Sequence, residues 1–278
     1  MKIALPITSF LPNIGGMEVG IHNLAKNLKE LGHQPVIITS YSIFRKLQRK
    51  KKLPYEVTYF FPKMFSIFQK NHNLGLFLSE KYLKKLHNKY NFDFWHITMA
   101  FPLGVMFINF AKRNNFKNYL IRAVGEDIQI NKKINYGYML KKENEKIIKK
   151  FLPQCRNFVS ISNTIYDRYK TLGINSNSIH NIPNAVSTQR FKIKSIAEKK
   201  KLKERYNLPQ NTILLMTLGR NHPKKKYDFL IKLIKIMSLK NIRFKFLFVG
   251  QGVNKLKKNI DINKITEYVI LIDTSKEF

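Results

Sequence analysis

The sequence of 278 residues is poor in cysteine and in acidic side chains, and it has no long apolar run. The single cysteine, Cys155, excludes an internal disulfide and a metal cage built from thiolates, so we expect a half-buried thiol. No stretch approaches the roughly 18 apolar residues that a membrane-spanning helix needs. The first residues also become polar too soon for a signal peptide, so the sequence predicts a cytoplasmic protein.

Acidic residues number 17 against 51 lysines and arginines, which gives a formal net charge of +34. Lysine, asparagine and isoleucine are abundant together, a bias that an AT-rich genome imposes, and an anionic partner is a second cause. Clustered lysines attract anionic lipid head groups by about 1 kcal/mol per charge. The basic cluster 45–52, followed by aromatic residues at 59–61 and 64–68, is therefore a candidate membrane-surface or lipid-acceptor element. Nucleic acid is the rival partner, but the chain has no helix-turn-helix, zinc-ligand set or RNP-type aromatic pair to bind it.

Apolar strands alternate with helix-periodic segments in the first part of the chain, which is typical of a mainly parallel, doubly wound sheet. The pattern predicts strands over 2–8, 35–40, 57–61, 94–98, 119–124, 158–161 and 179–182. It predicts helices over 16–31, 74–89, 102–113, 138–149 and 163–172.

A charged stretch with little apolar periodicity, 192–205, then predicts a crossing segment between domains. The alternation resumes with strands expected at 213–218, 244–249 and 268–272 and a helical face around Leu230 to Met237. We therefore expect an α/β protein of two Rossmann-like domains, 1–185 and 186–278. The second has only three strands, so one side of its sheet is unfinished and that domain is incomplete.

Two turns between a strand and a helix are candidate phosphate sites. Arg220 and Lys225 lie on a loop that follows the strand 213–218, where fixed charge and free N–H groups can converge on a diphosphate. Gly15 and Gly16 precede the first helix and let the backbone approach a ligand without a Cβ in the way. The structural alternatives are a solvated basic loop for the first turn and a tight packing turn for the second.

Several short segments follow one another in a particular order and spacing. They are Gly15-Gly16-Met17-Glu18 with the helix that ends at Gly32-His33, then 93–96, 122–128, 160–162, 182–186 with Phe191, 219–225 and 248–252. Together they resemble the retaining GT-B glycosyltransferases of the large group-one family, of the family-four type, over nearly the whole chain. Members of that family move a sugar from a nucleotide-sugar donor to an acceptor.

The resemblance implies a donor site formed mainly by the second domain. A guanidinium and an ammonium there would neutralise the donor diphosphate as it leaves, so that no metal or other cofactor is required. Glycines would shape the phosphate and nucleotide loops, and backbone near Thr274 would contact the base. The implied donor-binding residues are Gly16, Arg220, Lys225, Gly250, Gly252 and Thr274.

The resemblance also implies an acceptor side in the first domain. His96 is the candidate catalytic residue at the end of a strand, although many family members carry His-x-His there and this sequence has Thr98 at the second position. A structural histidine is the alternative. Arg122, Glu126 and Asp127 are acceptor-side candidates, with a structural ion pair as an equal alternative.

The chain departs from the family pattern at Ala185, Lys226 and Asp273, which stand where glycines are usual. Each Cβ restricts the backbone and shifts the expected loop. The Glu-x7-Glu motif, whose carboxylates contact the donor sugar in the family, would lie beyond Phe278. We therefore expect a fragment or a C-terminally truncated enzyme with weak or absent turnover.

These observations favour a retaining, metal-independent glycosyltransferase of bacterial surface polysaccharide or glycolipid assembly, with a glycan or lipid-linked acceptor and peripheral contact with an anionic membrane. The alternative is a non-catalytic protein that binds sugar nucleotides or a membrane surface. A nucleic-acid-binding protein is the third reading.

Overall fold

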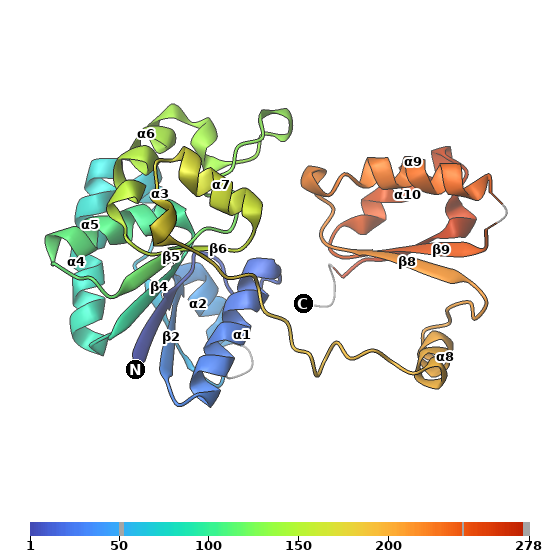
Figure 1. The fold of residues 1–278 in the computed structure, drawn as a ribbon, viewed down its shortest axis with the longest axis horizontal. Coiled ribbons are helices and arrows are strands. Elements are labelled where there is room, and N and C mark those ends of the chain that lie inside the picture. Colours follow the sequence, from blue (N-terminus) through green and yellow to red (C-terminus); the bar gives the residue numbers. More distant parts are fainter. Residues whose placement is uncertain (50–52, 241, 275–278) are drawn as a thin grey trace. The chain divides into compact units, whose positions relative to one another are not determined.

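The structure is a computed structural model that describes residues 1–49, 53–240 and 242–274 (Figure 1). The chain divides into two compact units, Met1–Ala185 (unit 1) and Val186–Phe278 (unit 2). Each unit is described by itself below. Both are built on parallel sheets, so the predicted α/β class is confirmed.

Unit 1 is organised around a seven-stranded parallel sheet with the order β3-β2-β1-β4-β5-β6-β7. The strand order reverses beside β1, as in other doubly wound sheets. All seven expected strands are present, with ends that differ by up to two residues from the prediction. Their bounds are β1 Lys2–Pro6, β2 Gln34–Ser40, β3 Glu56–Phe60, β4 Phe94–Thr98, β5 Tyr119–Arg122, β6 Phe158–Ser160 and β7 Ile179–Asn181.

Helices cover both faces of this sheet (Figure 1). Two of them begin at side-chain caps, because Asn71 accepts a hydrogen bond from Leu74 N and Ser162 accepts one from Ile165 N. The short helices α2 and α3 were not predicted. The bounds are α1 Gly16–Glu30, α2 Tyr41–Gln48, α3 Met64–Lys70, α4 His72–Tyr90, α5 Val105–Arg113, α6 Lys142–Phe151 and α7 Asn163–Thr171.

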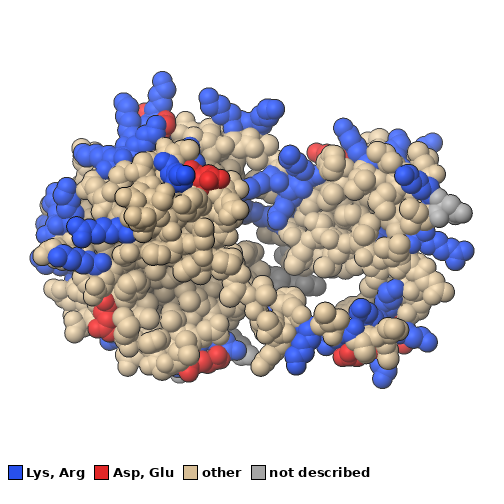
Figure 2. All heavy atoms as spheres, viewed as in Figure 1, with Lys and Arg blue, Asp and Glu red and all other residues tan. Residues whose placement is uncertain are grey.

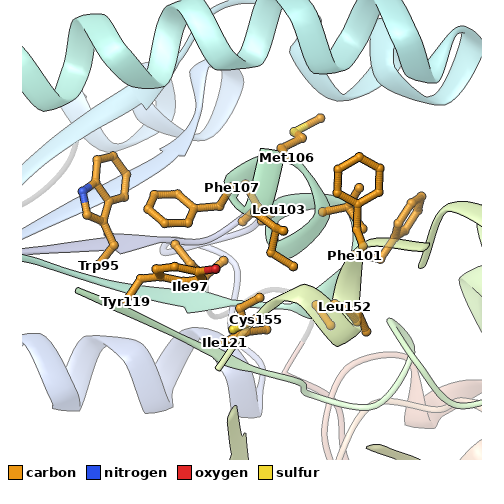
Figure 3. Close-up of a cluster of buried hydrophobic side chains, with 14 of the residues drawn as sticks. Trp95, Ile97, Phe101, Leu103, Met106, Phe107, Tyr119, Ile121, Leu152 and Cys155 are labelled. Atoms are coloured by element: carbon orange, nitrogen blue, oxygen red, sulfur yellow. The ribbon is translucent and has the colours of Figure 1, made fainter. Parts of the chain in front are cut away.

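Alternate residues of the strands divide the core of unit 1 into two layers. On one face, helices α3 to α6 pack over a large aromatic cluster around Trp95 and Phe107, both at most 1% exposed (Figure 3). On the other face, α1 and α2 pack on Leu5 and Ile37, both fully buried. Burial on both faces explains why these strands appear in the sequence as nearly continuous apolar runs.

The aromatic half of the predicted membrane-surface element belongs to this core. Met64 and Phe68, on α3, are 1% and 0% exposed, and Phe60, on β3, is fully buried. An apolar run has the same composition whether it faces a core or a bilayer, which is why the sequence interpretation was wrong here. The basic cluster 45–52 begins on α2, and its residues 50–52 lie outside the described residues.

Unit 2 contains a three-stranded parallel sheet with the order β10-β9-β8. One face is covered by α9 and α10, which bury Phe246 and Phe248 against Ile231 and Ile260. The other face stays open in the described part of the unit, where Met216 is 64% and Leu218 is 68% exposed. The bounds are β8 Ile213–Leu218, α9 Tyr227–Ser238, β9 Phe244–Val249, α10 Lys257–Ile262 and β10 Val269–Ile272.

The segment between the last strand of unit 1 and the first of unit 2 is exposed from 181 to 202. It contains the helix α8, Ile196–Arg205, where the sequence predicted only a charged crossing segment. A capping box between Ser195 and Glu198 begins this helix, and none of its residues is buried. Local capping, not tertiary packing, therefore defines α8.

On the face drawn in Figure 2, basic side chains are scattered over both units and acidic ones are sparse. Ion pairs are few in the described residues, and they join neighbours four apart on or beside a helix, such as Lys149 and Glu145 at 2.7 Å. Across residues 1–49, 53–240 and 242–274, not one helix is both long and apolar enough to cross a bilayer.

Candidate functional site

In unit 2 the loops that follow the three parallel strands meet at one edge of the sheet. The amide of Gly219 donates to Val249 O at 2.8 Å, and that of Gly250 donates to Ile272 O at 3.0 Å. Thr274 N in turn donates to Gly250 O at 3.4 Å. The structure thereby brings together the predicted donor-binding residues that belong to this unit: Arg220, Lys225, Gly250, Gly252 and Thr274.

Glycine is required where two of these loops touch. Gly250 has a φ of 146°, and a Cβ placed on it would lie 2.2 Å from Gly219 O. L-residues rarely adopt such a φ, and backbone atoms cannot move aside cheaply. Gly250 therefore permits the close contact of the β8 and β9 loops, which is the packing role that its position in the sequence also allowed.

The Lys225 side chain folds back over the loop that follows β8. A Cβ on Gly219 would lie 2.9 Å from Lys225 Cε and 3.2 Å from Nζ, so the ammonium rests against the Gly219 backbone. Tyr227, the first residue of α9, supports the same turn by donating from its hydroxyl to Gly219 O at 2.9 Å. Arg220 follows Gly219 directly and is exposed. Two cations therefore flank one backbone turn, an arrangement that suits a diphosphate.

Asp273 supplies a carboxylate at the same edge. It accepts hydrogen bonds from Gly252 N at 3.2 Å and from Asn254 N at 3.1 Å. These are N–H groups at the start of a helical turn, which otherwise attract anions. The Asp273 carboxylate thus occupies these N–H groups of the β9 loop. The β8 loop, with Lys225, is therefore the cationic side of the site. The sequence marked Asp273 as a departure from the glycine pattern but gave no sign of these contacts.

Gly16, the remaining predicted donor-binding residue, is the first residue of α1 in unit 1. A Cβ on Gly16 would meet nothing within 4 Å, whereas one on Gly15 would lie 2.5 Å from the Glu18 carboxylate. The close approach in this glycine pair is therefore at Gly15, to a side chain of the same helix. A phosphate contact at Gly16 stays a prediction.

In unit 1, His96 and Arg122 lie on the same face of the sheet, because Thr98 pairs with Arg122 in the register of β4 and β5. The Nε2 atom of His96 is enclosed and has no hydrogen-bond partner among the described residues. Burial and the charge of Arg122 lower the pKa of His96 to about 3. The imidazole is therefore neutral at physiological pH and cannot serve there as an acid in its charged form.

Arg122 joins the end of β5 to the exit from unit 1. Its Nη2 donates to Asn184 Oδ1, in the segment just before the unit boundary. Asn184 was part of the motif Pro183-Asn184-Ala185-Val186, but nothing in the sequence predicted this partner. Arg122 thus fixes the position of the chain where it leaves the sheet.

Asp127 is fully buried and is placed differently from the acceptor-side expectation. Its carboxylate accepts from Ala100 N at 2.6 Å, Val124 N at 3.1 Å and Gly125 N at 2.8 Å. These bonds join the loop after β4 to the loop after β5. Since no surface of Asp127 is exposed, it positions these loops and does not itself contact a ligand in this conformation. Its neighbour Glu126 is exposed, and Arg122 donates to Asn184, so the alternative of a structural ion pair is not seen among the described residues.

Other reactive groups do not form a second centre. Cys155 is 4% exposed rather than half-buried, and burial raises the pKa of its thiol to about 11. Within the described residues, histidine, cysteine, aspartate and glutamate do not gather in threes at metal-binding distance.

The sequence profile of glycosyltransferase family 4 matches residues 14–190. Alpha-monoglucosyldiacylglycerol synthase of Acholeplasma laidlawii is 22% identical, over 97% of this chain and 68% of the relative. The phosphatidylinositol N-acetylglucosaminyltransferase GPI3 subunit of Saccharomyces cerevisiae is 25% identical, over 96% of this chain and 55% of the relative. The crystal structure of Anabaena Alr3699/HepE in complex with UDP-glucose superposes with a TM-score of 0.70 at 16% identity, over 98% of this chain and 69% of that one.

The fold and the loop geometry define a two-unit α/β protein of the GT-B type, as the sequence predicted. The match to more than half of the chain shows the family: this chain belongs to glycosyltransferase family 4. It spans between about half and two thirds of the length of the two curated relatives.

Proposed function

We propose that this chain takes part in the transfer of a sugar, with retention at the anomeric carbon, from a UDP-sugar to a lipid-linked acceptor. The observation that carries the proposal is the β8 loop of unit 2, where Lys225 and Arg220 flank the Gly219 turn. A sugar leaves a nucleotide-sugar only if the charge that develops on the diphosphate is stabilised. Two cations beside one turn would provide that stabilisation without a metal.

UDP as the nucleotide is supported by the Anabaena protein, whose structure contains UDP-glucose. A lipid acceptor is supported by the names of the two curated relatives, one a diacylglycerol glycolipid synthase and the other a phosphatidylinositol glycosyltransferase subunit. The high positive charge of the chain fits an anionic acceptor or an anionic membrane surface. Assembly of a surface polysaccharide or glycolipid is the process in which such a product would be used.

Unit 1 is the proposed acceptor side. His96, neutral because burial and Arg122 lower its pKa to about 3, would contribute a hydrogen bond and not a proton. The proton of the acceptor hydroxyl would then pass to the departing phosphate, which is consistent with front-face attack and retention. Asp127 would act indirectly, by holding the loops after β4 and β5 in place.

The experiment is a calorimetric titration of the purified chain with UDP-glucose, UDP-N-acetylglucosamine and GDP-mannose. Lys225→Gln and Arg220→Gln each remove a charge-assisted contact, so we expect about ten- to a hundredfold weaker binding of the preferred donor. Lys235→Gln, which removes an exposed charge from α9 in the same unit, is the matched control and should leave affinity within about twofold.

A second measurement follows radioactive sugar from the preferred donor into diacylglycerol and phosphatidylinositol in vesicles. Transfer that is lost in Lys225→Gln and kept in Lys235→Gln would support the proposal, and donor binding without any transfer would reduce it to a binding function. Equal affinity in wild type, Arg220→Gln and Lys225→Gln would overturn the proposed donor site.

A further inference from the structure

Unit 1 contains an open hollow of about 360 Å³ that the donor and acceptor residues do not use. The hollow lies at the start of β5, at Tyr119, and beside the segment that leads into β6. Asn157, in that segment, is joined to β5 because its O atom accepts from Ile121 N at 3.0 Å. Thr98 and Arg122 lie at the opposite ends of their strands. The lining comes from α5, the α5–β5 loop and the segment before β6: Ile108, Ala111, Lys112, Asn115, Phe116, Lys117, Tyr119, Gln154, Arg156 and Asn157.

Three cations surround the hollow, and no carboxylate lines it. Lys112 is held by Gln154, whose Oε1 accepts from Nζ at 3.2 Å, while Lys117 and Arg156 are exposed. None of the three forms an ion pair within the described residues. Their charges are therefore available to an anion.

Many basic side chains on this surface point into open solvent, so charge alone would not define a site. The hollow differs because it also has a rigid apolar floor. Ile108, Ala111 and Tyr119 are 1%, 3% and 8% exposed and belong to the main core of unit 1, and Phe116 packs against that core (Figure 3 shows Tyr119 beside Phe107 and Cys155). A floor of this kind keeps its shape without a ligand and can contact the organic body of one.

We propose that this hollow binds an organic phosphate ester, with the phosphate between Lys117 and Arg156 and the organic body on Phe116 and Tyr119. A guanidinium binds two phosphate oxygens at once, and an ammonium adds a point charge. Asn115 and Asn157 supply amide groups at the same rim. The ester is either a soluble phosphate or the head group of a phospholipid, since both present the same chemistry to these residues.

The test measures binding of three probes by calorimetry: glycerol 3-phosphate, monomeric dihexanoyl phosphatidic acid, and glycerol as the phosphate-free reference. The paired variant Lys117→Gln with Arg156→Gln should weaken both phosphate probes by about tenfold or more. The control, Lys26→Gln with Lys29→Gln, likewise removes two positive charges, from α1 on the other face of the sheet. We expect it to change affinity by less than about twofold.

The ratio of the affinities for the two phosphate probes shows whether the bound ester is a soluble phosphate or a phospholipid. Equal affinities for the two phosphate probes indicate a soluble ester, and a preference of at least about tenfold for the lipid, lost in Phe116→Ala, indicates a phospholipid. Thermal melting of each variant establishes that it is folded. Equal weakening in the paired variant and in the control, or no binding of either phosphate probe by wild type, would overturn the proposal.

The double variant Arg220→Gln with Lys225→Gln distinguishes binding at the hollow from binding at the donor site. It should leave the affinity of the hollow for both phosphate probes unchanged. If the phosphate probes instead lose affinity only in that variant, they bind in unit 2 and the hollow is not a phosphate site. Because UDP-sugar binding is measured separately, failure of the hollow leaves the proposed function standing.

Discussion

The two units hold their candidate residues in opposite ways. In unit 1, Asp127 is fully buried with three backbone partners, and His96 has an enclosed ring nitrogen. In unit 2, Arg220 and Lys225 are exposed on loops that glycines allow to touch. The difference teaches that the same kind of sequence motif, a polar residue after a parallel strand, can stabilise loops in one sheet and leave charge exposed to solvent in the other.

The sheets of the two units also differ in how far their faces are covered. The central strands of unit 1 are covered on both faces, whereas the open face of unit 2 exposes Met216 and Leu218. A buried polar group in unit 1 should therefore affect the free energy of unfolding, while a charge on the loops of unit 2 should affect mainly the affinity for the proposed donor. The following changes test that division, from the largest expected effect to the smallest.

Asp127→Asn should lower the free energy of unfolding of unit 1 by about 4 kcal/mol, because the amide NH₂ faces backbone donors that the carboxylate accepted. Hydrogen exchange of the peptides that contain β4 and β5 measures the loss. Glu126→Gln is the matched control at an exposed neighbour and should stay within about 0.5 kcal/mol. If the two variants lose the same stability, Asp127 does not join the loops.

Gly250→Ala should destabilise unit 2 by about 3 kcal/mol, since the new Cβ would lie 2.2 Å from Gly219 O at a φ of 146°. UDP-sugar binding should fall with it. Gly20→Ala, in the interior of α1 with nothing within 4 Å of its Cβ, should instead stabilise unit 1 by about 0.5 to 1 kcal/mol. Hydrogen exchange reports each unit separately, and unchanged exchange in Gly250→Ala would show that the loops can part.

The lowered pKa of His96 predicts that the stability of unit 1 depends on pH. This pKa is about 3 in the folded chain and about 6.5 when unfolded, so the unfolded chain binds more protons between these values. Stability is then fully present above about pH 6.5 and is lost as the pH falls, by about 2 kcal/mol at pH 5. His96→Gln should remove this part of the difference in unfolding free energy between pH 5 and pH 7.5, as measured by urea unfolding. An identical difference in the variant would mean that the imidazole is not enclosed in solution.

Lys226→Gly should raise the stability of unit 2 by about 1 kcal/mol. Lys226, the N-cap residue just before α9, has a φ of 50°, a left-handed conformation that is unfavourable for a residue with a Cβ. Thermal unfolding of the variant checks the effect. A decrease in stability would indicate that the Lys226 side chain makes stabilising contacts that outweigh the strain.

Much of the fold could be predicted from the sequence because parallel strands buried on both faces are nearly continuous apolar runs. Strands β4, β8 and β9 were predicted with their observed bounds. Helices α2 and α3 were missed because each is short and buries only one or two residues, too few for a helical period to be visible. The aromatic run at 64–68 was misread because composition does not say which surface covers it.

The candidate site was predictable only in part. Position after a strand correctly placed Arg220, Gly250 and Thr274 at one edge, since parallel strands end together. The partners could not be predicted, because Asp127 accepts from Ala100 N and Asp273 accepts from Gly252 N, in loops that are distant in sequence. Such bonds leave no periodic pattern in the chain.

The continuous exposure of residues 181–202 has a consequence for how this protein can be handled. A long exposed stretch with little packing is a preferred place for trypsin to cut, and its lysines supply the cleavage points. Brief digestion should therefore cut the chain between the two units. For the same reason, insertions or deletions here should be tolerated by both of them.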